Sequence, residues 1–80
     1  MNIKELRKIT NRDKFTEMPL STQAYYVHLA MNAYKNNFVR NPKALLRALE
    51  ADDEEIEILE HENYIIKNDD YGITLNNYRG

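Results

Sequence analysis

The residues of this sequence that are suited to catalysis or metal binding are few and poorly spaced. His28 and His61 are the only histidines, they are far apart in the chain, and there is no cysteine. Zinc sites need clustered His or Cys ligands, so this pair does not predict one. The acidic run at residues 52–55 lacks the glycine and alternating spacing of a calcium loop, and two glycines in all leave no phosphate-cradling loop. The sequence therefore predicts no enzyme, cofactor, metal or small-molecule substrate.

The charged residues are divided unevenly along the chain, which points instead to macromolecular binding. Residues 1–47 contain nine Lys and Arg against three Asp and Glu, a net charge of +6, whereas residues 48–80 contain two against ten, a net charge of −8. A basic half suits contact with nucleic acid, and complementary halves suit head-to-tail pairing of copies, although both halves also suit a simple solvated surface. The cations that we expect to contact DNA phosphates are Lys8, Arg12, Lys35, Arg40, Lys43 and Arg47, with Lys4, Arg7 and Lys14 beside them.

The length of 80 residues predicts a single domain. No apolar run is long enough to span a membrane, and residues 1–10 are too charged for a signal peptide. We therefore expect a cytoplasmic protein that does not associate with membranes.

The elements that must position the charged residues are three helices followed by a hairpin. Residues 1–15 form a basic lead-in with a short helix, and residues 16–63 form the helical core. The first core helix is expected over residues 21–33, with Ser21 as its cap. The second begins at Pro42, after the N-cap Asn41. The third begins at Asp52, where Glu55 completes a capping box.

The hairpin is expected over residues 64–76, where two β-prone runs flank a polar loop that ends in Gly72. Residues 38 and 39 form a brief apolar strand or anchor. Three helices followed by a hairpin is the order of a winged helix-turn-helix, a mainly α fold with a small β-hairpin (α+β). One of Tyr25 and Tyr26 should face solvent, and the core should contain Leu20, Val27, Leu29, Met31, Leu45, Leu49, Ile56 and Leu59.

The third core helix is unsuited to reading DNA in the major groove. Residues 52–62 contain seven acids and no Lys or Arg, so they would repel a polyanion. Two modes of binding remain, namely contact with the backbone of double-stranded DNA and self-association into a homo-oligomer. The apolar residues that we expect to mediate self-association are Ile3, Leu6, Ile9, Tyr64, Ile66, Ile73 and Leu75.

Residues 13–29 contain a D-x-F, an M-P-L-S-x-Q-A and an aromatic-x-H-L sequence in this order. This stretch resembles the opening of phage replisome organisers, which are related to the DnaD-type primosomal proteins, and the likeness covers roughly residues 7–79. The resemblance implies a winged-helix domain that helps to assemble replisome proteins at an origin. Family members usually have tryptophan where Tyr78 stands and continue into a C-terminal replication domain, so the chain is expected to be a fragment or a stand-alone copy of the N-terminal module. The alternative is a sequence-specific transcriptional regulator of phage or mobile-element origin.

Overall fold

Five helices and three short strands make up the part of the chain that the structure describes, which is residues 2–68 and 72–76 of a computed structural model. The hairpin turn at residues 69–71 and the family position at Tyr78 lie outside these residues. The α+β class is confirmed. In chain order the elements are α1 (Ile3–Thr10), α2 (Asp13–Thr16), α3 (Leu20–Met31), β1 (Phe38–Val39), α4 (Pro42–Ala48), α5 (Glu54–His61), β2 (Ile65–Lys67) and β3 (Ile73–Leu75).

The three strands form one antiparallel sheet with the order β1-β3-β2. Thr74 of the central strand pairs with Phe38 on one side and with Ile66 on the other. The expected strand at residues 38–39 and the expected hairpin are both confirmed. The strand does more than return to the core, because it completes the sheet along the free edge of β3.

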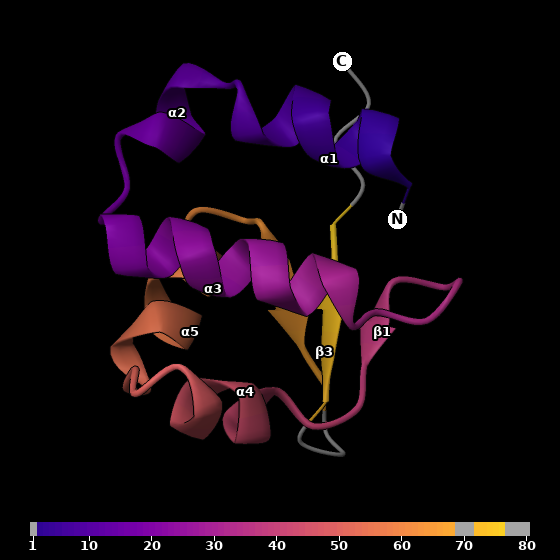
Figure 1. The fold of residues 1–80 in the computed structure, drawn as a ribbon, viewed down its shortest axis with the longest axis vertical. Helices are drawn as coiled ribbons and strands as arrows, with labels where there is room; N and C mark the ends of the chain where they lie inside the picture. Colours follow the sequence, from indigo (N-terminus) through magenta and orange to yellow (C-terminus); the bar gives the residue numbers. More distant parts are fainter. Residues whose placement is uncertain (1, 69–71, 77–80) are drawn as a thin grey trace.

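Helix α3 is the central helix of the molecule, and neighbours cover it on two sides. Figure 1 shows α1 and α2 on one side of α3 and α4 and α5 on the other. This position explains why Tyr25, Tyr26 and Leu29 are all 0 % exposed. The prediction that one of the two tyrosines faces solvent is wrong, because a helix packed on both sides buries adjacent positions.

The expected core residues at the two ends of α3 are also wrong. Leu20 is 81 % exposed and Met31 is 72 % exposed, and Ala24 between them is exposed as well. The two large aromatic side chains occupy the interior that the aliphatic residues were expected to fill. Of the other expected core residues, Leu29, Ile56 and Leu59 are buried, whereas Val27, Leu45 and Leu49 are partly buried.

Three aromatic rings join the lead-in, the central helix and the start of the hairpin. Phe15 of α2, Tyr26 of α3 and Tyr64 before β2 pack edge to face in all three pairs, with ring centroids 5.5 to 5.7 Å apart. Edge-to-face pairs add stability beyond the burial of their area. Tyr64 reaches this position because Asn63 adopts a left-handed conformation (φ 65°) that turns the chain sharply after α5.

Asn41 caps α4 as expected, since its Oδ1 accepts a hydrogen bond from the Ala44 amide at 3.4 Å. Ser21 does not cap α3, which begins after Pro19 and has no side-chain cap. Among the described residues, no helix is both long enough and apolar enough to cross a membrane.

The burial of α3 predicts opposite outcomes for two leucines in the same helix. Leu29→Ala should lower the free energy of unfolding by about 2 to 5 kcal/mol, because it removes a fully buried side chain. Leu20→Ala should change it by no more than about 0.5 kcal/mol, since that side chain is already in solvent. Urea denaturation of both variants checks this, and equal losses would contradict the observed face of α3.

Candidate nucleic-acid interface

A buried carboxylate fixes α5 against the start of α3. Glu55 is 7 % exposed, and its Oε1 accepts hydrogen bonds from Thr22 Oγ1 at 3.0 Å and Ser21 Oγ at 3.3 Å. The expected capping box at Glu55 is therefore wrong, because the side chain turns toward α3 instead of its own helix. A negative charge beside the first turn of α3 is also favourable to the dipole of that helix, which has no side-chain cap.

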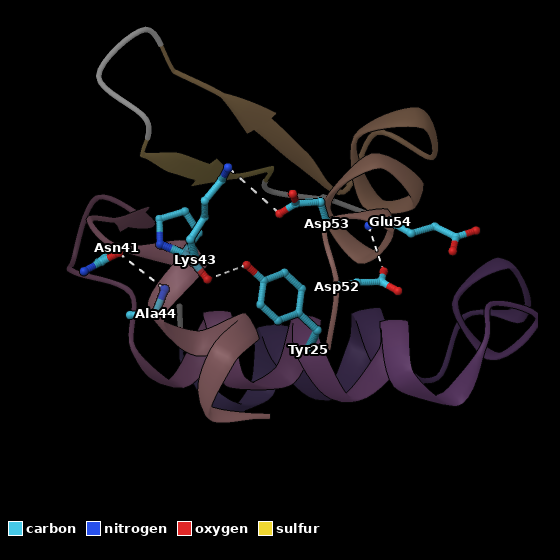
Figure 2. A network of polar contacts seen from close by, with 8 residues as sticks. Tyr25, Asn41, Lys43, Ala44, Asp52, Asp53 and Glu54 are labelled. Carbon is cyan, nitrogen blue, oxygen red and sulfur yellow. Dashed lines mark hydrogen bonds and ion pairs between the residues drawn. The ribbon is translucent and has the colours of Figure 1, made fainter. Parts of the chain in front are cut away.

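A second buried contact fixes α4 against α3, as Figure 2 shows. The Tyr25 hydroxyl donates a hydrogen bond to the Pro42 carbonyl oxygen at 2.8 Å. Burial, together with the nearby charges of Asp53 and Glu55, raises the pKa of Tyr25 above its ordinary value, so the phenol stays protonated and remains a donor. A side chain of α3, Tyr25, thus holds α4, and a side chain of α5, Glu55, holds α5 against α3.

The exposed face of α5 is acidic, and two lysines from neighbouring elements partly neutralise it. The Nζ atom of Lys43 in α4 lies 4.0 Å from Oδ1 of Asp53, and the Nζ atom of Lys67 in β2 lies 3.4 Å from Oε1 of Glu60. Lys43 and Lys67 also line a hollow of about 280 Å³ between α4, α5 and the hairpin. Exposed pairs of this kind add little stability, but they engage two cations that DNA would otherwise meet.

The structure does not gather the expected phosphate contacts on one face. Lys8 and Arg12 belong to the lead-in, whereas Lys43 and Arg47 belong to α4, and α3 lies between these helices (Figure 1). The basic residues therefore form two groups. The first group is on and around α1 and α2, and the second runs from Lys35 through Arg40 to α4.

Within the first group, α1 presents an unbroken basic stripe. Lys4, Arg7 and Lys8 are all exposed, and their spacing of three and four residues places them on one helical face. No ion pair to any of the three occurs within residues 2–68 and 72–76. Their charges are therefore available to a polyanion.

Arg12 has a different environment from the α1 stripe. It is only partly exposed, and its positive charge acts on the buried Tyr64 hydroxyl. Burial raises the pKa of Tyr64, and the charge of Arg12 opposes this shift. The position of Arg12 beside the aromatic rings makes it a poorer candidate for phosphate contact than the exposed lysines.

Most of the residues that we expected to mediate self-association are buried within the domain itself. Ile9, Tyr64, Ile73 and Leu75 are each 1 to 2 % exposed, and Leu6 packs against the core. The four buried side chains are not available to another copy, and Leu6 is partly buried. Ile3 and Ile66 are the remaining two, at 72 % and 50 % exposed.

The two polar side chains that hold the helices together were missed in the sequence. The Asp52-x-x-Glu55 spacing predicts a cap, and the sequence around Tyr25 predicts no polar partner for its hydroxyl. A usable signal is present for Glu55, since it lies four residues before Leu59 and therefore on the same, inward face of α5. No local signal identifies the Pro42 carbonyl as the partner of Tyr25.

Removing the Glu55 carboxylate should destabilise the domain, whereas removing its neighbour should not. Glu55→Ala leaves the Thr22 hydroxyl, which is 0 % exposed, without this acceptor and should cost about 1 to 3 kcal/mol. Glu54→Ala is the matched control, because Glu54 is exposed. Chemical denaturation of both variants measures the difference, and identical midpoints would exclude this role for Glu55.

Metal binding and known relatives provide no further assignment. Among residues 2–68 and 72–76, no three His, Cys, Asp or Glu side chains come together in a way that could hold a metal ion. No family model, curated protein or solved structure matches the chain.

Proposed function

We propose that this chain is a non-enzymatic winged-helix module that binds the backbone of double-stranded DNA during replication initiation. The element order supports this proposal, because α3, α4 and α5 are followed by a hairpin, and β1 joins the hairpin as a third strand. A winged helix-turn-helix has this order of helices and wing. The resemblance of residues 13–29 to replisome organisers supports the role in replication.

The basic stripe of α1 is the observation that carries the DNA proposal. Lys4, Arg7 and Lys8 are rigidly spaced, exposed and unpaired with any described acid. Phosphate contacts of this kind hold DNA without reading its sequence. Helix α5, by contrast, has the place of the recognition helix in this order, and its acids would be repelled by the phosphates of the major groove, which makes a sequence-specific regulator the weaker alternative.

Neutralising the α1 stripe should weaken duplex binding and its dependence on salt. Each phosphate contact contributes about −0.9 to the slope of log K against log salt. The triple variant Lys4→Gln, Arg7→Gln and Lys8→Gln should therefore make this slope shallower by about 2 to 3. Fluorescence anisotropy with a labelled duplex between low and physiological salt measures this slope. Lys43→Gln with Lys67→Gln is the control, since these two lysines already lie beside Asp53 and Glu60.

Two results would overturn the duplex proposal. One is a triple variant that binds duplex DNA as tightly as the natural sequence does. The other is one preferred operator bound at nanomolar strength in physiological salt, which phosphate contacts alone do not produce.

Self-association remains part of the proposal, now limited to the exposed apolar residues. Ile3 and Ile66 are the members of the expected set that are largely exposed. Ile3→Ser with Ile66→Ser should lower the sedimentation coefficient without lowering thermal stability, because neither side chain belongs to the core. A natural protein that already sediments as a monomer at low and high salt would exclude self-association.

A further inference from the structure

Tyr34 is an exposed aromatic residue in the loop between α3 and β1, which projects from the side of the molecule (Figure 1). The Tyr34 side chain is 55 % exposed even though its ring is stacked on another aromatic ring. The centroids of Tyr34 and Phe38 are 6.3 Å apart and the rings are inclined by 19°. An offset stack of this kind supports one face of the Tyr34 ring and leaves the other face open to a further planar group.

The backbone of the loop holds Tyr34 in place. The Tyr34 amide donates to the Phe38 carbonyl, and the Asn37 amide donates to the Tyr34 carbonyl, both at 2.9 Å. Asn37 adopts a left-handed conformation (φ 63°), and its carbonyl accepts a hydrogen bond from the Leu75 amide of β3 at 2.9 Å. The loop is therefore attached to the sheet, so little conformational entropy is lost when a ligand stacks on Tyr34.

Phe38 also packs closely against Gly72. A Cβ atom at Gly72 would lie 2.5 Å from the Phe38 ring, so a side chain there would displace the ring. The Phe38 ring therefore contacts both the Gly72 backbone and the exposed Tyr34 ring.

The surroundings of this ring are cationic. Lys35 follows Tyr34 directly and Arg40 follows β1, and both side chains are exposed. Within the described part of the chain neither one forms an ion pair. The sequence has no Asp or Glu from residue 18 to residue 49, so the stretch of chain that contains Tyr34, Lys35 and Arg40 is free of acids.

We propose that Tyr34, Lys35 and Arg40 form a binding site for single-stranded DNA. One base stacks on the open face of the Tyr34 ring, and the neighbouring phosphates lie against the two cations. A duplex cannot use the ring in this way, because its internal bases already stack on each other. The site tolerates any sequence, since every base has a π face. It is distinct from the α1 stripe, which is proposed to bind the duplex backbone.

Substitutions at Tyr34 test stacking directly. The probe is a fluorescently labelled oligothymidylate of about ten nucleotides, within the range of single-strand site sizes, and binding is measured by anisotropy. Tyr34→Ala should weaken binding roughly ten-fold, the loss expected for one stacked base. Tyr34→Phe should bind as the natural protein does, because it keeps the flat ring.

Tyr34→Leu separates stacking from general apolar contact, since leucine keeps apolar volume without a flat π face. It should bind as weakly as Tyr34→Ala, and its thermal midpoint shows whether the domain is still folded. Lys35→Gln with Arg40→Gln should flatten the salt dependence of oligothymidylate binding, whereas Tyr34→Ala should leave the slope unchanged.

Three results would overturn the proposal, and each is distinguishable from failure of the duplex site. The first is that the natural protein does not bind oligothymidylate. The second is that Tyr34→Leu and Tyr34→Phe bind it equally well. The third is that Tyr34→Ala loses duplex binding and single-strand binding to the same extent. The duplex proposal is tested by the triple variant of α1, so the first two results leave it unaffected. Retained duplex binding by a folded Tyr34→Ala protein that has lost oligothymidylate binding supports two separate sites.

Discussion

The edge-to-face packing of Phe15, Tyr26 and Tyr64 is the interaction on which the arrangement of this domain depends. The three rings come from the lead-in, the central helix and the entry to the hairpin, so each segment is held by the other two. A chain this short buries a limited apolar area, and large aromatic side chains supply much of it. The lead-in is consequently part of the folded domain, and the basic stripe of α1 has a fixed place on it.

Polar contacts then set the positions of the two helices that face the hairpin. Glu55 binds the hydroxyls at the start of α3, and Tyr25 binds the Pro42 carbonyl at the start of α4. The bonds of Glu55 to Thr22 and of Tyr25 to Pro42 are buried, so their loss would leave polar atoms without these partners and away from water. They leave most of the acids of α5 exposed on the outer face of that helix, whereas exposed cations lie on α1 and beside β1.

The sequence predicted the kinds of element better than it predicted their faces. The Asn41-Pro42 pair located the start of α4, and the β-prone runs located the hairpin, because both signals are local. The faces of α3 depend on which neighbours cover it, and no pattern within residues 20–31 reveals that it is packed on two sides. The basic candidates were recognised by residue type, but their separation into two groups by α3 is a tertiary property. The role of Tyr34 was not predicted, because the stack with Phe38 depends on the conformation of the loop between them and Gly72 comes from a distant part of the chain.

The ring cluster also gives the domain an optical signal of its own. The chain has six tyrosines and no tryptophan, so its near-ultraviolet circular dichroism comes from tyrosine and phenylalanine alone. Rings fixed in an asymmetric environment give such a signal, and rings that rotate freely do not. Because two of the clustered rings are tyrosines, detachment of the lead-in from α3 would diminish the near-ultraviolet band, while the far-ultraviolet spectrum of the remaining helices would persist.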